Sequence, residues 1–530
     1  MHRPPAAEAE IAAELAVHRP DLGPRYTAGL PGVRAAVLTR LWRALTHEPL
    51  PWITAHEPSA DGLTLRLSDG RRLHGPRPDP FATDGYVTVV DLAGVAYDDP
   101  ARLMADLGVP HSAGFAGELA HSTASLALSR ANQAEADGGS APTLPRDSAT
   151  APGNSPLLNG SPASEPSCVN WPVTDWEWEQ RVVDGHPYHP NCRSRPGFSV
   201  AEQLAYGPEH RPSVRLSLVP VPAEECLVSG EWPAEMRDGA RLLIPAHPWQ
   251  ARHVLKRTTD AGLTAHPLMS LRTLALPGGG PHVKTALSAR LTSSVRDISI
   301  GSVLASATLS AFAETVAART DGLLHITRTP SAATANSPDL AAVWRESPQR
   351  YAAPGEHIVP IAALATTELP SRPDWSAEFA RLCLTVGLRL LDLGVALEAH
   401  GQNLLVVLSA QGAPLRLVYR DLADIRVSPA RLARHGIALP ELPERILTDD
   451  VTALRSKLFG SLVAGALGST AGSRTALGEA LASAVTGLPP TPDLVALCEQ
   501  PLPTKALTLM RLSPGVSGDQ WALLPNPLAD

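Results

Sequence analysis

The chain has 530 residues, of which 44% are hydrophobic and 18% are charged, and its formal net charge is -8. This length exceeds a single hydrophobic core and predicts two to four domains, and the composition is that of an ordinary globular protein. The negative charge argues against nucleic acid as the main partner, so local basic clusters are expected to serve something small.

The first 133 residues predict an α+β domain. Apolar residues at helical spacing indicate a short helix that includes Val17 and, after a Pro/Gly break, a second helix over 33–45. Residues 51–96 change to period two, with a Ser-Asp-Gly turn between two strands. A helical pattern then returns from about 100 to 133.

Residues 134–167 are rich in Gly, Ser, Pro and Ala, which predicts a low-complexity linker or insertion. The rest is expected to form a β-rich domain over 168–340 and a mostly helical domain over 341–530. Five widely spaced cysteines indicate neither a cysteine-ligated metal site nor a disulfide framework. Without a targeting segment, and with 458–468 too short to cross a bilayer, a cytoplasmic protein with no membrane partner is expected.

The segment 185–198, GHPYHPNCRSRPGF, combines two His-Pro steps with two arginines. Proline disfavours a helix here, so His186 and His189 are expected on a rigid loop with their imidazoles presented instead of packed. This also argues against a helical His-x-x-His zinc site. Because Arg193 and Arg195 would attract carboxylate or phosphate, the segment predicts an anion-binding loop.

Two later stretches continue the β-rich domain. SVRLSLVPV and LLIPAHPWQ predict strands, with Gln250 as a polar lining residue. The stretch 270–299 predicts two strands joined by a glycine-rich turn. If that turn centres on Gly279, Leu274 pairs with Lys284. A phosphate would then meet a face of basic and hydroxyl side chains, formed by Arg272, Lys284, Ser288 and Arg290.

Residues 377–397 predict a strong amphipathic helix, followed by EAHGQN and a hairpin that turns at Gln411-Gly412. Symmetric pairing about this turn sets Asp421 opposite Gln402 and returns it to the Glu-His-Gln-Asn run. Carboxylates suit Mg²⁺, while imidazole and amide groups suit phosphate oxygens. The cluster therefore predicts a magnesium-nucleotide site, formed by Glu398, His400, Gln402, Asn403 and Asp421.

Four motifs occur in order: GHPYHPNCRSRPGF, IPAHPWQ, SLRT followed by KTALSARLTSSVR, and EAHGQN followed by RDL. In this combination the chain, over 171–424, resembles the NRPS-independent siderophore synthetases of the aerobactin-synthetase (IucA/IucC) type. It departs at Arg193, where the family usually has lysine, and this changes the geometry of an anion contact. The resemblance implies a multidomain α+β fold shaped like a cupped hand, with thumb, fingers and palm around a central ATP-binding cleft.

The resemblance further implies an AMP-forming ligase that uses ATP and Mg²⁺. A citrate-like acid would be adenylated and then condensed with an amine, hydroxylamine or hydroxyl nucleophile, with a neutral histidine as a candidate proton acceptor. A homodimer is common among relatives. By matching motif, catalytic roles fall to His186, Arg296, His400 and Lys284. Nucleotide contacts fall to Ser270, Arg272, Thr273, Lys284, Gln402, Asn403 and Asp421. Substrate contacts fall to His189, Arg193, Arg195, Arg296 and His400, and metal contacts to Glu398 and Asp421.

Two other functions share some of these features. A kinase-like phosphotransferase also has a polar run, a hairpin and a carboxylate, but His-Gly-Gln stands where its catalytic aspartate is expected. A non-catalytic or redox protein of iron uptake is the second alternative. It would be expected to have a cysteine cluster, whereas Cys498 stands alone. The sequence identifies neither the acid nor the nucleophile.

Overall fold

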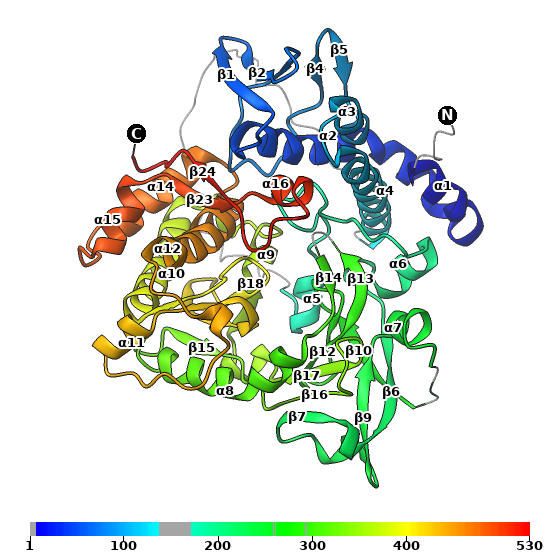
Figure 1. Ribbon diagram of the computed structural model, residues 1–530, viewed down its shortest axis with the longest axis vertical. Helices are drawn as coiled ribbons and strands as arrows, with labels where there is room; N and C mark the ends of the chain where they lie inside the picture. The colour runs from blue at the N-terminus through cyan, green and yellow to red at the C-terminus, as the bar shows by residue number, and fades with distance from the viewer. Residues whose placement is uncertain (1–6, 137–170, 258, 260, 292–293, 530) are drawn as a thin grey trace, which may run out of the picture.

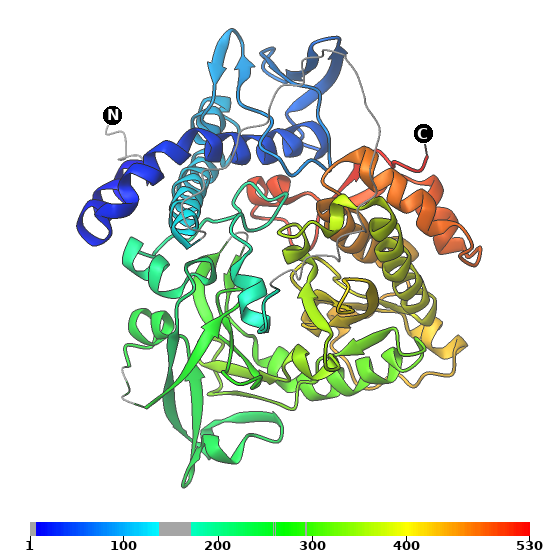
Figure 2. The ribbon, with the colours of Figure 1, turned by 180° about the vertical axis from the view of Figure 1, so that it is seen from behind.

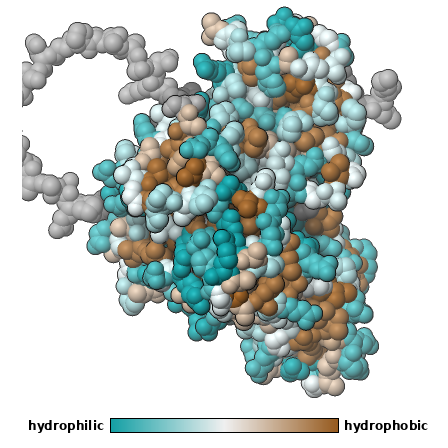
Figure 3. All heavy atoms as spheres, turned by 60° about the vertical axis from the view of Figure 1, so that its left-hand side comes forward, coloured by the Kyte–Doolittle hydropathy of each residue, from teal (hydrophilic) through white to brown (hydrophobic). Residues whose placement is uncertain are grey.

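The computed structural model describes residues 7–136, 171–257, 259, 261–291 and 294–529. Most of the predicted linker at 134–167 lies outside these residues, and only its first three belong to a described helix. In Figure 1 the N-terminal part, a large sheet and the C-terminal part lie around a common centre. Apolar and polar side chains are interspersed on the face in Figure 3.

The N-terminal part combines helices with an antiparallel sheet of five strands in sequential order. Its elements are α1 (Ala7–His18), α2 (Gly23–His47), β1 (Ile53–Ser59), β2 (Gly62–Leu67), β3 (Arg72–Gly75), β4 (Val90–Leu92), β5 (Val95–Tyr97), α3 (Pro100–Leu107) and α4 (Ser112–Ala136). Two local predictions were wrong. The second helix starts at Gly23 and continues through Pro31, and Val17 is 76% exposed because the buried stripe of α1 consists of Ile11 and Leu15.

The middle part of the chain forms a nine-stranded sheet, and all its described strand pairs are antiparallel. In spatial order its strands are β7 (Leu227–Gly230), β16 (Ser331–Thr334), β17 (Ala341–Arg345), β12 (His282–Thr285), β11 (Thr273–Ala275), β10 (Gly262–Pro267), β6 (Val214–Pro222), β9 (Arg241–Ala246) and β8 (Arg237–Asp238). Helix α8 (Ile300–Ala317) packs on β7 and β16. Among the described helices it alone has the length and hydropathy of a membrane span, a property that core helices share.

The predicted ribbon at 270–299 is only partly correct. The glycine-rich turn does join β11 to β12, but Thr273 pairs with Lys284, one residue away from the predicted register. The reason is a four-residue turn closed by Gly280 N–H donating to the Pro277 carbonyl at 3.3 Å, which moves the centre of the hairpin. Ser288 and Arg290 belong to a separate two-stranded sheet of β13 (Leu287–Leu291) and β14 (Ser294–Arg296), not to the predicted face.

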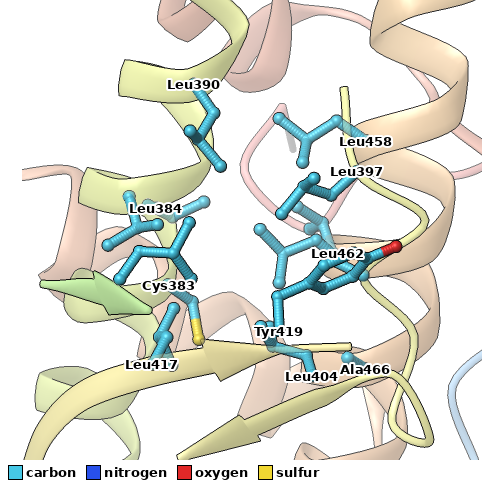
Figure 4. Close-up of a cluster of buried hydrophobic side chains, with 14 of the residues drawn as sticks. Cys383, Leu384, Leu390, Leu397, Leu404, Leu417, Tyr419, Leu458, Leu462 and Ala466 are labelled. Atoms are coloured by element: carbon cyan, nitrogen blue, oxygen red, sulfur yellow. The ribbon is translucent and has the colours of Figure 1, made fainter. Parts of the chain in front are cut away.

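The C-terminal part is built on a four-stranded sheet in the order β15-β21-β20-β18. Its strands are β15 (Leu324–Ile326), β21 (Pro414–Tyr419), β20 (Leu404–Leu408) and β18 (His357–Pro360). The predicted helix is α10 (Pro373–Leu393). Figure 4 shows side chains of α10 packing against those of β20, β21 and α12 (Val451–Leu458). Side chains of the π-helix Phe459–Leu467, which follows α12, pack in the same cluster. This part also contains helices α14 (Arg474–Val485), α15 (Pro492–Glu499) and α16 (Leu507–Leu512) and strands β23 (Leu502–Lys505) and β24 (Trp521–Leu524).

The chain passes between the two large sheets more than once. β15 belongs to the four-stranded sheet, β16 and β17 return to the nine-stranded sheet, and β18 crosses back. The multidomain α+β architecture is therefore confirmed, with two sheets whose strands interleave along the chain. This interleaving brings residues from distant motifs to one place.

The predicted hairpin register is confirmed. Leu404 pairs with Tyr419, and Arg420 N–H donates to the Asn403 carbonyl at 3.0 Å. Continuing this pairing sets Asp421 opposite Gln402, as symmetric folding about the turn requires.

Candidate functional site

A solvent-open pocket lies where the two sheets approach each other. Its polar wall carries Arg272, Lys284 and Arg345 around Asp421. Its apolar wall includes Ile298, Ala305, Leu309, Val343, Leu422 and Ile446. A concave site with one apolar wall and a few convergent charges is typical of a pocket for a small anionic ligand.

Asp421 is the centre of the charged cluster. Lys284 Nζ lies 2.5 Å from its carboxylate and Arg345 Nη2 lies 3.7 Å away. Burial by itself would raise the pKa of Asp421, but Lys284 and Arg345 outweigh burial and hold that pKa well below its usual range. Burial lowers the pKa of Lys284 to about 8, although Asp421 opposes this. Three cations around one carboxylate leave an excess of positive charge for an anion.

Two residues at this cluster have left-handed backbone. Asp421 has φ 72° and Leu271, which precedes Arg272, has φ 67°. A bulky residue at positive φ is strained, and such strain gathers at functional sites. At Asp421 the conformation is supported by the Tyr419 hydroxyl, which donates to the Asp421 carbonyl at 3.2 Å.

Arg272 and Arg296 are joined through the backbone. The Arg272 guanidinium donates to the carbonyls of Arg296 and Asp297, the latter at 2.7 Å. Burial lowers the pKa of Arg272 to about 10. Arg296 is half-buried, and within the described part of the chain no carboxylate lies within ion-pair distance of it. Among these residues, Arg296 therefore forms no ion pair with its neighbour Asp297.

Ser270 and Thr273 support the turn that carries Arg272. Thr273 N–H donates to Ser270 Oγ at 3.1 Å, and Thr273 is buried as the first residue of β11. Both residues lie beside the pocket through this turn.

Three predicted histidines share one hydrogen-bonding pattern. His186 Nδ1 accepts from Tyr188 N–H at 3.2 Å, His189 Nδ1 from Asn191 N–H at 3.0 Å, and His400 Nδ1 from Gln402 N–H at 3.2 Å. Burial lowers the pKa of all three, that of His189 to about 3. Each ring is thus neutral and carries its proton on Nε2, so it is a hydrogen-bond donor toward a ligand.

The His-Pro loop differs from its prediction in how it is packed. His186 still contacts solvent although the surrounding protein atoms desolvate its ring, whereas His189 is only 1% exposed, and the Nε2 of His189 has no partner in the described structure. Arg195 lies 2.7 Å and Arg193 3.3 Å from the Glu209 carboxylate, and all three side chains are buried. Arg193 also donates to the Val183 carbonyl at 2.7 Å. These two arginines therefore support the loop from inside, where the sequence predicted anion contacts.

Glu398 is held by lysines from the C-terminal part. Lys505 Nζ lies 2.7 Å and Lys457 Nζ 3.5 Å from Glu398 Oε1. The same lysines bind Asp424 and Asp519. Asn403 Nδ2 donates to the Glu398 carbonyl at 3.2 Å. The described residues contain no cluster of three or more metal ligands. Glu398 and Asp421 supply two carboxylates. Two carboxylates suit Mg²⁺ only when the same cation also binds phosphate oxygens, as is usual in nucleotide sites.

Several residues of the site were missed by sequence reasoning. They are Arg345 and Arg445 in the pocket wall, the buried Arg420 and Glu179, and Lys457 and Lys505. The sequence analysis named no site residue after Asp421, whereas Lys457 and Lys505 of the C-terminal stretch bind the Glu398 carboxylate. A usable signal was present, because the chain has only four lysines, at 256, 284, 457 and 505. Three of the four bind carboxylates at the site.

Gln250 does not line the site as predicted. Its side chain is buried and donates to Ser288 Oγ and to the Asp339 carbonyl, both at 2.9 Å. This glutamine ties α7 (Pro248–His253) to β13.

Two segments of the chain match models of known protein families. Residues 174–366 match the model described as the IucA / IucC family. Over these residues the chain is similar to the IucA/IucC family. Residues 373–519 match a second model, described as ferric iron reductase FhuF-like transporter. In that region Cys383 is buried and Cys498 is half-buried, and the described residues there form no cysteine cluster.

The curated relatives that this chain matches are distant. It is 25% identical over 315 residues to a citryl-spermidine/3,4-dihydroxybenzoyl-citryl-spermidine:spermidine ligase of Bacillus anthracis, covering 47% of this chain and 51% of the relative. It is 28% identical over 313 residues to the rhizobactin siderophore biosynthesis protein RhbC of Rhizobium meliloti, covering 46% and 53%. The chain thus spans about half the length of the curated relatives it matches.

Solved structures show the same fold. The petrobactin biosynthesis protein AsbB of Bacillus anthracis has a TM-score of 0.72 at 17% identity, with 99% of this chain and 98% of that chain covered. ATP-bound aerobactin synthetase IucA of Klebsiella pneumoniae has a TM-score of 0.64 at 17% identity, with 94% and 99% covered. The fold expected from the motifs is therefore shown over nearly the whole chain.

Proposed function

We propose that this chain is an AMP-forming ligase of siderophore biosynthesis. It adenylates a polycarboxylic acid with ATP and transfers the acyl group to an amine, hydroxylamine or hydroxyl nucleophile. The observation that carries the proposal is the cluster of Arg272, Lys284 and Arg345 around Asp421, in a pocket with one apolar wall. The names of relatives agree, since one is a D-ornithine–citrate ligase of Staphylococcus aureus.

The adenylation step brings two anions together. A carboxylate of the acid attacks the α-phosphorus of ATP, the bond to pyrophosphate breaks, and an acyl-adenylate forms. Arg272, Lys284 and Arg345 offset the repulsion and stabilise the charge on the phosphates. When bound, Mg²⁺ neutralises further phosphate charge, and Glu398 and Asp421 are the residues that would hold it.

The histidines act in this mechanism as donors. His186, His189 and His400 present Nε2–H groups, which suit oxygens of the acid and of the α-phosphate. Arg296, which has no carboxylate partner in the described structure, is assigned to the acid. Since Nε2 already carries a proton, these rings do not take the proton from the nucleophile, and the histidine acceptor that the family resemblance implies has no place in this mechanism.

The remaining assignments follow from placement. Ser270, Thr273, Gln402 and Asn403 shape the nucleotide site, while Arg193 and Arg195 position the His-Pro loop through Glu209. We propose citrate or a related dicarboxylate derivative as the acid, a cytoplasmic location and a homodimer, with no nucleic-acid or membrane partner.

A product assay tests the proposal. The protein is incubated with Mg-ATP, hydroxylamine as surrogate nucleophile, and citrate, a succinyl derivative or 2-oxoglutarate. We expect AMP and pyrophosphate in equal amounts, only when an accepted acid is present. Release of ADP without AMP would overturn the proposal in favour of a phosphotransferase.

A further inference from the structure

Helix α5 (Asp175–Gln180) lies between the two sheets that form the pocket, as Figures 1 and 2 show. Trp176 stacks on His266 of β10, with ring centroids 4.5 Å apart. Trp171, just before the helix, lies edge-on to His357 of β18 at 4.6 Å. This one short helix therefore contacts the nine-stranded sheet on one side and the four-stranded sheet on the other.

Asp175 attaches α5 to the nine-stranded sheet. Its carboxylate lies 2.6 Å from His282 Nε2 and accepts from the Ser347 hydroxyl at 3.0 Å. All three side chains are buried. Burial alone would raise the pKa of Asp175, but His282 and Ser347 hold it below its usual value, so the carboxylate is ionised. His282 begins β12 and lies two residues before Lys284, on the same face of the strand.

Glu179 attaches α5 to the other half of the pocket. Its carboxylate lies 2.6 Å from Arg420 Nη1 and accepts from Met269 N–H at 2.9 Å. The Glu179 side chain is 0% and that of Arg420 5% exposed. Arg420 directly precedes Asp421, and its guanidinium also donates to the Gln402 carbonyl at 3.1 and 2.9 Å. Met269 directly precedes Ser270 in the turn that carries Arg272.

These contacts lie next to Lys284, to Asp421 and to the turn that carries Arg272. Lys284 comes from one sheet and Asp421 from the end of a strand in the other, yet their charged atoms lie 2.5 Å apart. A buried ion pair contributes little net stability because desolvation offsets its attraction. Two such carboxylates on a six-residue helix are better explained by a need for fixed geometry.

We propose that Asp175 and Glu179 are positioning residues that hold the two halves of the nucleotide site at their working separation. Asp175 acts through His282 on Lys284, and Glu179 acts through Arg420 on Asp421 and through Met269 on the Arg272 turn. Neither carboxylate touches the nucleotide. The inference rests on the proposed function, since it assumes that the cluster binds the phosphates of ATP.

The first test is Glu179→Gln, which keeps the shape of the side chain and removes its charge. We expect the Kd and KM of Mg-ATP to rise about 10- to 100-fold per folded molecule, as for other residues that orient a ligand-binding group. Asp175→Asn is expected to act in the same direction. Glu177→Gln is the matched control, because Glu177 lies on the same helix but is exposed and only caps it through Thr174. Unchanged ATP binding in Glu179→Gln and Asp175→Asn would overturn the inference.

The second test separates positioning from stability. In Glu179→Met/Arg420→Met an apolar pair replaces the buried charges, so thermal stability should recover relative to either single variant. ATP binding should stay weak, because Met269 N–H and the Gln402 carbonyl have lost the groups that orient them. Recovery of both stability and ATP binding would show a purely structural anchor.

The same measurements distinguish failure of the inference from failure of the proposed function. If the wild-type protein neither binds Mg-ATP nor forms AMP with any acid tested, the proposed function fails and the inference fails with it. If the wild type does both and the variants match it, the inference alone fails.

Discussion

Lys284 is a buried cation whose contacts indicate a role in ligand binding. Within the described structure its ammonium has Asp421 as carboxylate partner, and burial lowers its pKa to about 8. Arg345 also approaches Asp421, at 3.7 Å, so Asp421 keeps a cation when Lys284 is removed. The lysine is therefore available to a second anion, and its loss should affect ligand binding more than folding.

We expect Lys284→Met to weaken ATP binding or turnover roughly 100-fold or more, since removal of one stabilising charge from a reaction site has this effect. Steady-state kinetics of AMP formation measure it. Lys256→Met is the matched control, because Lys256 is exposed and lies outside the pocket. Equal activity of the two variants would contradict the role of Lys284.

Arg296 is expected to act on the acid instead of stabilising the fold. Its best hydrogen bond in the described structure is a long one, from Nη2 to the Leu291 carbonyl at 3.4 Å. Arg296→Lys keeps the charge but loses the planar fork, so turnover should fall about tenfold or more with the melting temperature nearly unchanged. Arg290→Lys, an exposed change on the neighbouring strand β13, is the control. A variant that melts early but keeps full activity per folded molecule would make Arg296 structural.

At the scale of elements, the β11–β12 hairpin shows how a turn sets register. Gly278 and Gly279 have φ 69° and 72°, a region that residues with a Cβ adopt at a cost. A Cβ at either position would meet no neighbouring atom within 4 Å. The cost of a substitution is therefore backbone strain alone.

Gly279→Ala should destabilise the protein by about 1 kcal/mol, the cost of one left-handed alanine. Gly117→Ala, at an exposed position in the second turn of α4, should instead stabilise it by roughly 0.5–1 kcal/mol. Here too a Cβ meets nothing within 4 Å. Denaturant unfolding of the two variants compares the effects, and an equal sign for both would refute the strain argument.

At the scale of the whole molecule, buried neutral histidines link stability to pH. Burial lowers the pKa of His47, His189 and His247 to about 3 and that of His121 and His210 to about 4. The unfolded chain, with histidine pKa near 6.5, therefore binds more protons below that pH. Glu48 acts in the opposite direction, because burial raises its pKa to about 7. Since five histidines oppose one glutamate, the histidines should dominate.

We therefore expect the free energy of unfolding to be nearly constant between about pH 7 and 8, where Lys284 is still charged, and to fall as pH drops from 6.5 toward 4. Urea unfolding at a series of pH values measures this slope. His247→Asn should reduce it, because asparagine can still cap α7 as His247 does for Trp249 N–H at 3.2 Å but cannot titrate. A slope unchanged by this substitution would show that His247 does not contribute.

Local patterns determined much of this protein. The turn at Gln411-Gly412, together with a register shift beside it between Val407 and Leu408, sets the β20–β21 pairing, and both features are local to the hairpin. The apolar stripe of α10 likewise predicts its buried face. The four motifs predicted Lys284, Asp421 and His400 as site residues, and the structure places Lys284 and Asp421 in the wall of one pocket.

Only the tertiary structure decided what these residues contact. Glu209 reaches Arg193 and Arg195 across a bend in the chain, Lys505 meets Glu398 from 107 residues away, and Glu179 meets Arg420 from 241 residues away. Periodicity describes which face of an element is buried, but it does not say which other element covers that face. Whether an arginine binds substrate or supports a loop depends on the carboxylate that packing brings to it, and packing is a property of the whole chain.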